Sequence, residues 1–447
     1  MMDKTLQEHL DPYLLVVRHV ESRLKERGIR LPKTRRTQVR GAIRKGIEDG
    51  HFSLDFTDNE LARATLSDEE RKAQQIDLEI DTDDLLQQIR EVVPTIMRET
   101  IEGASKAVLA AVLRDTKNLR AVRTRRAAFE RRLQRWWGRS LDLFEVLKSI
   151  ALEVGSNFND EVSQGSDPLM YALVRLHARA VLVASEIEAL LRTGHADGAH
   201  ARWRTLHEVT VVAIFLANHG AEIAERYIEH DAVESWKAAL GQQDKQAELG
   251  LDPFSSEEME QLRKRVETLT TKYGALYRTD YGWAANASDK AEPHFSDLEK
   301  AVGLDYLRPY YKLASHNIHA GPKGAFFRLG LMSNDVLLAG PSNSGLADPL
   351  MGAGNALVQI TITLLTTKPN VDRLVACRVL MGLNARLTDA AIAAHRKVAA
   401  DEKARRETID SRRAGPSQDS HSGVGGLRTR RSGRSRGVVI LPVNRER

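Results

Sequence analysis

Apolar residues recur every three or four positions along most of the chain, which is the spacing of an amphipathic helix. After Pro94 these positions continue without another proline to about Leu152. The pattern predicts one long amphipathic helix, or two helices joined near Gly138. A helix of this length needs a domain or a partner to cover its apolar side, so a coiled coil in a homodimer is compatible with it.

The central region repeats the helical spacing in shorter segments that are separated by glycines and prolines. Gly194 and Gly220 follow two of these segments directly, in the position where glycine commonly ends a helix. The predicted helices of this region cover residues 169–192, 201–218, 221–240, 255–273, 305–319, 347–366 and 371–400.

Three segments depart from the helical pattern. Residues 51–56 alternate weakly between apolar and polar positions, like a short strand. Residues 325–338 are poor in helix signals, and this second segment is expected to form a short β-hairpin. Beyond about residue 410, Gly, Ser, Pro and Arg dominate, and a chain with so few apolar residues is expected to be disordered.

The predicted fold class is therefore all-α, a multi-helix bundle with a long N-terminal amphipathic helix. Four regions are expected: a small basic helical module over 1–90, the long helix over 94–153, a helical domain over 155–400, and a disordered basic tail over 411–447.

Composition narrows the class of protein. The 447 residues are 42% hydrophobic, enough for a real core, and Cys377 is the only cysteine, so no disulfide framework forms within one chain. The sequence has no pattern of a signal peptide and no uninterrupted apolar run of roughly 18 residues. No membrane association and a cytoplasmic location are the expectations.

The net charge of +5 is distributed unevenly. Asp77 to Asp84 is acidic, whereas the helix that follows and the tail are rich in arginine. From residue 411 the tail carries nine arginines against Asp419 and Glu446. The predicted helix carries ten basic residues between 113 and 139 against two acidic ones, namely Arg114, Lys117, Arg120, Arg123, Arg125, Arg126, Arg131, Arg132, Arg135 and Arg139.

This asymmetry favours an acidic partner, nucleic acid first, bound through helix 114–139 and the tail. Trp136 and Trp137 then provide two alternatives. They are stacking groups for bases beside a phosphate-binding surface, or they are core anchors on a helix whose arginines form a solvated face.

The sequence lacks several motifs of common enzymes. It has no Walker-type phosphate loop, no G-x-G-x-x-G after a strand, no G-x-S-x-G and no H-E-x-x-H. A single cysteine also excludes zinc sites built on cysteines. No cofactor and no metal are expected.

Arg204 and Glu208 stand four residues apart near the start of a helix that becomes strongly apolar, so they share one face, and His207 shares it with Arg204. Charged side chains at the head of a buried helix must be paired or lie in a solvated cleft. They are either a structural ion pair or part of a functional site.

The second polar segment is Ser315-His-Asn-Ile-His319, before Gly321 and Pro322. On a helix, Ser315 and His319 share a face, and His319 in the last turn is favoured as a cation by the helix dipole. The alternatives are a histidine that satisfies terminal carbonyls, or a weak metal pair of His316 and His319.

With these residues in place, the chain resembles a bacterial helical family of unknown function, DUF5677. The resemblance rests on Arg204-Thr-Leu-His-Glu208 and on Ser315-His-Asn-Ile-His319-Ala-Gly, and it covers about residues 165–370. It implies a helical fold and makes Arg204, Glu208, Ser315 and His319 the candidate catalytic residues.

A weaker resemblance is to the HEPN superfamily of helical ribonucleases and toxins, whose motif is R-x-x-x-x-H with a polar residue after the arginine. Aligned on His319, the polar position is Ser315, but the position of the arginine holds Ala314. The resemblance implies metal-free RNA cleavage only if Arg204 supplies the missing cation.

Two functions from different classes follow. The first is a nucleic-acid-associated or partner-binding module, of the kind used in stress responses or phage defence. The alternative is a metal-independent HEPN-like ribonuclease or toxin, with His319 as acid or base, Arg204 as the phosphate contact, and Ser315, Glu208 and Tyr311 as orienting groups. Both require that the two polar segments fold onto one another.

Overall fold

The computed structural model describes residues 51–55, 75–79 and 82–413, apart from 164, 286, 289 and 332–336, and isolated positions up to residue 41. The chain divides into two compact units, Met1–Thr124 and Arg125–Arg447. Most of the predicted basic module over 1–90 and the predicted tail from residue 414 lie outside the described residues.

The first unit contains a small sheet and a long helix. Strand β1 (His51–Asp55) pairs antiparallel with β2 (Gln75–Glu79), with His51 opposite Glu79. The strand predicted at residues 51–56 is therefore confirmed.

Helix α6 (Thr82–Arg114) follows the sheet, and Pro94 lies inside it. The prediction that Pro94 opens this helix was wrong. The helix begins twelve residues earlier, at Thr82.

Helix α7 (Thr116–Val162) begins one residue after α6 ends, so the predicted long helix breaks at Asp115 and not at Gly138. The side chain of Asp115 accepts a hydrogen bond from the backbone N–H of Asn118 at 2.9 Å, the arrangement of a helix N-cap. Gly138 is buried inside α7.

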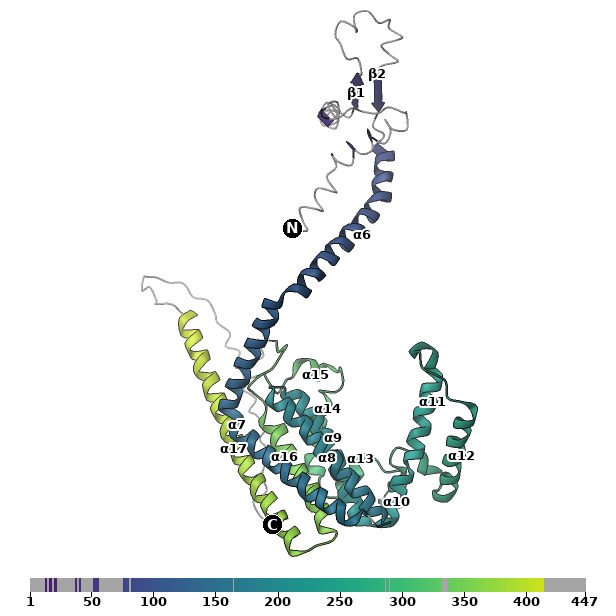
Figure 1. Ribbon diagram of the computed structural model, residues 1–447, viewed down its shortest axis with the longest axis vertical. Helices are drawn as coiled ribbons and strands as arrows, with labels where there is room; N and C mark the ends of the chain where they lie inside the picture. Colours follow the sequence, from purple (N-terminus) through teal and green to yellow (C-terminus); the bar gives the residue numbers. More distant parts are fainter. Residues whose placement is uncertain are drawn as a thin grey trace, which may run out of the picture. The chain divides into compact units, whose positions relative to one another are not determined.

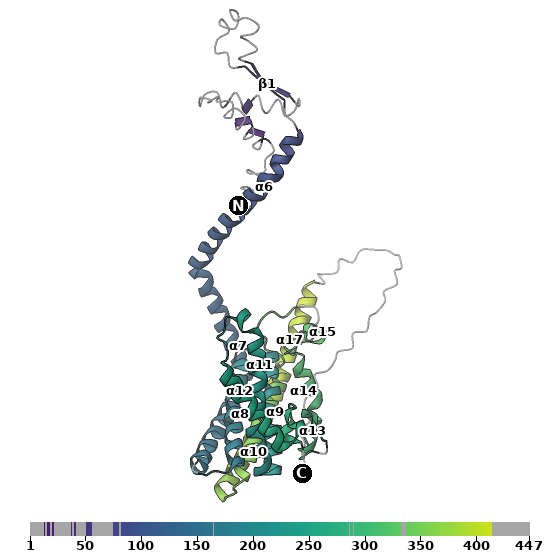
Figure 2. The same cartoon turned by 90° about the vertical axis from the view of Figure 1, so that its right-hand side faces the viewer.

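The second unit is a helical bundle built on α8 (Pro168–Arg192) and α9 (Ala196–His219), which pack along one another. Helix α16 (Ala347–Thr366) packs against both, and α17 (Val371–Arg413) covers α16 (Figures 1 and 2). The all-helical multi-helix architecture predicted for this region is confirmed.

The boundaries of α8 follow from its sequence. Asp167 caps the helix by accepting from the backbone N–H of Leu169, and Pro168 occupies the first turn, where its missing N–H costs nothing. At the other end Gly194 adopts a φ of +78°, which only glycine adopts readily and which confirms it as the residue that ends the helix.

Short helices extend from the bundle. Helix α10 (Ala221–Glu229) continues into a hairpin of α11 (Asp231–Leu249) and α12 (Ser256–Tyr273), which pack on each other (Figure 1). A series of short elements follows, comprising η1 (Ala275–Arg278), η2 (Gly282–Ala284), α13 (Phe295–Ala301), η3 (Asp305–Leu307), α14 (Arg308–Ser315) and α15 (Pro322–Phe326).

The hairpin predicted over 325–338 does not form in the described part of that range. Residues 322–326 are helix α15, which begins at Pro322 in the first turn, and residues 327–331 and 337–338 contain no strand. Residues 332–336 lie outside the described residues.

Helix α16 has the length and apolar composition that a membrane-spanning segment requires, and it is the one such helix in the described chain. Its residues face α8, α9 and α17, and 72% of its most apolar window is buried. The apolar sequence of α16 is therefore accounted for by its place in the core.

The contact between α7 and α8 yields a first prediction. A Cβ atom at Gly155 would lie 2.4 Å from Cε1 of the buried His177 ring. Alanine normally stabilises a helix by about 1 kcal/mol over glycine, but overpacking a core costs about 1–3 kcal/mol. Gly155→Ala should therefore lower the free energy of unfolding in urea, whereas Gly382→Ala, which meets no atom within 4 Å, should raise it. Equal effects of the two substitutions would contradict this packing.

Two buried histidines predict a loss of stability in mild acid. Burial lowers the pKa of His177 and of His200 from 6.5 to about 4. Between pH 6.5 and pH 4 the unfolded chain binds protons at these histidines that the folded protein does not bind. The contribution of the two neutral histidines to the free energy of unfolding is therefore complete above pH 6.5 and is lost as the pH falls toward 4. The contribution is on the order of 3 kcal/mol for each histidine. His177→Gln should make the free energy of unfolding depend less steeply on pH between pH 4 and 6.5. The number of protons taken up on unfolding should fall by up to one. An unchanged slope in urea titrations would contradict this assignment.

Candidate functional site

Arg204 and Glu208 lie on the same face of α9, as their spacing predicted. Their side chains form an ion pair with 3.0 Å between Nη2 of Arg204 and Oε1 of Glu208. The two side chains are 26% and 28% exposed, so solvent reaches both. Because α9 is buried further along, the pair stands at the edge of the core.

Tyr311 from α14 completes this pair. Arg204 donates a hydrogen bond to the Tyr311 hydroxyl at 2.6 Å, and that hydroxyl donates to the Glu208 carboxylate. The Arg204 guanidinium also lies 4.6 Å from the centre of the Tyr311 ring. Burial, and then the Glu208 carboxylate, raise the pKa of Tyr311, so the phenol keeps its proton and remains a donor. We call Arg204, Glu208 and Tyr311 the polar triad.

A buried carboxylate lies behind the triad. Glu299 of α13 accepts from Nε2 of His207 at 2.9 Å and from Arg308 at 2.6 Å, and its side chain is 0% exposed. Arg308 in turn lies 5.0 Å from the centre of the Tyr311 ring. A buried carboxylate is tolerated only when charged or hydrogen-bonding partners surround it, and these partners come from α9 and from the start of α14. The pairing therefore fixes α13 and α14 against α9.

Ser315 and His319 do not join the triad through any hydrogen bond or ion pair within the described residues. The Ser315 hydroxyl donates to the backbone carbonyl of Tyr311 at 2.9 Å. The side chain of His319 is exposed, and its backbone N–H donates to the carbonyl of Ser315 at 3.2 Å.

The helix predicted to reach His319 ends instead at Ser315. Residues 316–318 form a turn, and α15 then packs close to it, since a Cβ atom at Gly324 would lie 2.0 Å from the His316 carbonyl oxygen. His319 consequently follows the end of α14 and does not lie in its last turn, and its backbone N–H still bonds to the Ser315 carbonyl.

The triad presents donors and an acceptor at one solvent-reachable point. The guanidinium of Arg204 and the phenol of Tyr311 are both directed at Glu208 or at each other. An anionic ligand must therefore compete with Glu208 for these donors, while a ligand N–H or O–H meets the carboxylate.

Sequence reasoning found Arg204, Glu208 and Tyr311 and missed Glu299 and Arg308. The spacing of Arg308 and Tyr311, three apart at the start of a helix, was a usable signal for a shared face. Glu299 gave none, because a single glutamate in a seven-residue helix has no pattern that indicates burial.

The two tryptophans of α7 are core residues. Trp137 is 0% exposed, and its ring N–H donates to the carbonyl of Asn343 at 2.9 Å. Trp136 is half-buried and packs against the same core. Of the two alternatives for these residues, the core anchor is confirmed for Trp137.

A family model described as "Family of unknown function (DUF5677)" matches residues 170–336. The matched segment runs from α8 to beyond α15 and contains the whole triad together with Ser315 and His319. The expected resemblance to this family is confirmed over these residues. Comparison with curated proteins and with solved structures gave no match.

The buried carboxylate generates a prediction for this site. Glu299→Gln removes the charge that pairs with Arg308, and because Arg308 is 32% exposed and can be solvated, the free energy of unfolding should fall by about 1–3 kcal/mol. The exposed His319→Ala should change it by less than about 0.5 kcal/mol. Urea denaturation of both variants measures the difference. A Glu299→Gln protein as stable as the parent would show that the carboxylate does not hold α13 and α14 in place.

Proposed function

We propose that this protein, whose residues 170–336 match the DUF5677 family model, binds nucleic acid through the sugar-phosphate backbone. The binding surface is a set of arginines on α7 that directly precede the domain. We call this set the arginine face; it consists of Arg125, Arg131, Arg132, Arg135 and Arg139.

The observation that carries the proposal is the placement of these arginines. At about 100° of rotation per residue, the five fall within an arc of about 120°. Leu133, Trp137 and Leu141, all buried, occupy the opposite side of the same helix. The arginine face is therefore held toward solvent by the core packing of α7, and all five side chains are exposed.

The arginine face is not neutralised by neighbouring acids. Glu130 is the one acidic residue between 125 and 139, and it pairs with Arg126 at 3.0 Å. None of the five arginines forms an ion pair with any described residue. Guanidinium groups on one rigid helix suit phosphate oxygens, because each presents several donors in a fixed plane.

Recognition by such a surface is expected to be independent of base sequence. Contacts to phosphate position a protein on nucleic acid, while sequence is read by contacts to bases. Trp137 is buried on the opposite side of α7, where its ring N–H binds Asn343, so it is closed to a base bound at the arginine face. The affinity therefore comes mainly from released counterions.

Binding without cleavage is the reading that the site geometry supports best. The ribonuclease alternative needs the His319 imidazole beside Arg204 and a free Ser315 hydroxyl. That hydroxyl donates to the Tyr311 carbonyl, and no hydrogen bond connects His319 with Arg204 among the described residues. RNA that stays intact during binding is the expected result, and cleavage that Arg204→Ala and His319→Ala abolish would favour the alternative.

The test is the salt dependence of binding to a single-stranded RNA, followed by fluorescence anisotropy. Affinity should fall steeply with salt, and Arg131→Gln with Arg135→Gln should flatten the logarithmic slope by about 0.7 for each lost phosphate contact. The control pair is Arg263→Gln with Lys264→Gln, which removes the same charge from the exposed surface of α12. The proposal fails if RNA does not bind at low salt, or if both double variants weaken binding equally.

A further inference from the structure

A pocket of about 640 Å³ lies between α8, the α10–α11 junction, α12 and η2, on residues that the proposed function does not use. We propose that it binds a nucleotide whose base carries an amino group. Its size is within the range of roughly 300–1,000 Å³ typical of small-molecule sites. Charged side chains of both signs and aromatic rings line it together, which limits the ligands that fit.

One wall of the pocket is a stripe along α8. Tyr171, Arg175 and Arg179 are spaced four residues apart, so they follow one another on the same face. The Arg175 guanidinium lies 3.3 Å from the centre of the Tyr171 ring and bonds only to a backbone carbonyl, at 3.3 Å. No described carboxylate forms an ion pair with Arg175 or Arg179. Both cations therefore retain donors for an anionic group.

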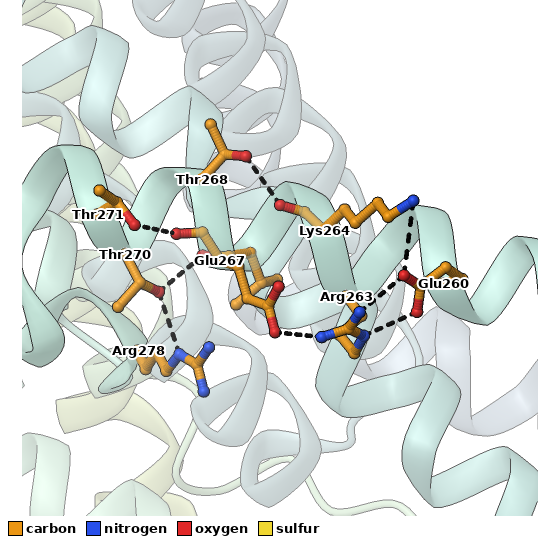
Figure 3. A network of polar contacts seen from close by, with 9 residues as sticks. Glu260, Arg263, Lys264, Glu267, Thr268, Thr270, Thr271 and Arg278 are labelled. Atoms are coloured by element: carbon orange, nitrogen blue, oxygen red, sulfur yellow. Dashed lines mark hydrogen bonds and ion pairs between the residues drawn. The ribbon is translucent and has the colours of Figure 1, made fainter.

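Arg265 of α12 adds a third cation to the pocket, and its neighbours show why it is distinctive. Arg263 pairs with Glu260 at 2.7 Å and with Glu267 at 2.5 Å, and Lys264 also reaches Glu260. Figure 3 shows this network. Arg265 has no such ion pair with a described residue and lines the pocket instead. The Arg265 charge does act on Glu229, whose carboxylate is bound by Lys272 and Tyr273. Three guanidinium groups that form no close ion pair with a described carboxylate suit a phosphate.

The interior of the pocket is aromatic. Trp283 is 3% exposed and meets the half-buried Tyr227 ring edge to face, with 5.0 Å between the ring centres. Arg226 holds the backbone of Trp283 in place by donating a hydrogen bond from Nε to the Trp283 carbonyl at 3.0 Å. Arg179 and Tyr227 both line the pocket; burial raises the pKa of the Tyr227 phenol, and the Arg179 charge opposes this rise. A planar ring beside a cation suits a nucleobase linked to a phosphate.

The wall contributed by α11 and the loop before η2 accepts hydrogen bonds. Three carboxylates line this wall, those of Asp231, Glu234 and Asp280. Lys237 binds two of them, Glu234 at 3.4 Å and Asp280 at 2.8 Å. Asp231 has no ion pair with a described residue. It is therefore the carboxylate most available to a ligand N–H.

His230 adds a further acceptor to this wall. Its Nε2 lies 3.0 Å from the carbonyl oxygens of both Tyr277 and Thr279, so that nitrogen carries the proton. Burial lowers the pKa of His230, and the neutral ring has its acceptor at Nδ1, which lies 3.8 Å from Oε1 of Glu234.

These three sets of groups select the ligand class. Inorganic phosphate would leave the aromatic rings and Asp231 unused, and an uncharged aromatic molecule would leave three arginines unused. A nucleotide uses all of them: its phosphate meets Arg175, Arg179 and Arg265, and the amino group of adenine, guanine or cytosine donates to Asp231. The nucleotide is either free or the terminal residue of a nucleic-acid strand.

Isothermal titration calorimetry of the full chain with AMP, GMP and CMP tests the inference. At least one of the three should bind, and Arg179→Gln or Arg265→Gln should each weaken that binding about 10- to 100-fold. Adenosine, which lacks the phosphate, should bind weakly and be insensitive to both substitutions. Arg263→Gln is the matched control on α12 and should leave every affinity unchanged.

The base contact has its own test. Asp231→Ala should abolish the preference for AMP over purine riboside 5′-monophosphate, which lacks the amino group. Far-ultraviolet circular dichroism melting curves separate loss of binding from loss of the fold in each variant. Failure of all three nucleotides to bind at millimolar concentration, or loss of affinity in Arg263→Gln equal to that in Arg265→Gln, would overturn the proposal.

The two sources of the nucleotide and the two proposals are distinguishable. A short oligonucleotide with a 5′-phosphate that displaces AMP, when its 5′-hydroxyl counterpart does not, identifies a strand end as the ligand; displacement by neither identifies the free nucleotide. Arg131→Gln with Arg135→Gln should weaken RNA binding and leave AMP binding intact. Arg179→Gln with Arg265→Gln should weaken AMP binding and leave the binding of internal RNA segments intact.

Discussion

The pairing of Glu299 with His207 and Arg308 is the interaction on which the arrangement around α9 depends. A carboxylate that is fully closed to water needs partners, and one partner, His207, lies 92 residues before Glu299 in the chain, while Arg308 follows it by nine. Once Glu299 is satisfied, α13 and α14 lie against α9, and Tyr311 reaches Arg204 and Glu208. The polar triad is thus a consequence of a buried ion pair behind it.

The bundle itself places its chemistry at the rim. Helices α8, α9 and α16 bury apolar residues against one another, and the charged residues of α8 that cannot enter this core face outward. Arg175 and Arg179 therefore stand on the side of α8 that meets α10, where Tyr227 and Trp283 supply an aromatic surface. The same rule sets the arginine face of α7, because Leu133 and Trp137 fix its opposite side in the core.

The two proposed surfaces differ in what they recognise. The arginine face is an open row of cations on one helix, which suits a polyanion of any sequence. The pocket at α8 combines cations, rings and acceptors from four elements, which suits one ligand of defined shape. The match to DUF5677 covers the pocket and the triad, whereas the arginine face lies before the matched residues.

The sequence by itself determined the helical class, the strand at 51–56, the ends of α8 and α9 at Gly194 and Gly220, and the shared face of Arg204 and Glu208, because these depend on local spacing and local backbone geometry. Only the tertiary structure decided that α14 stops before His319 and that Glu299 is buried. It also brought Arg175, Arg265 and Asp231 to one pocket. These outcomes depend on which distant segments pack together, and hydrophobic periodicity carries no information about that choice.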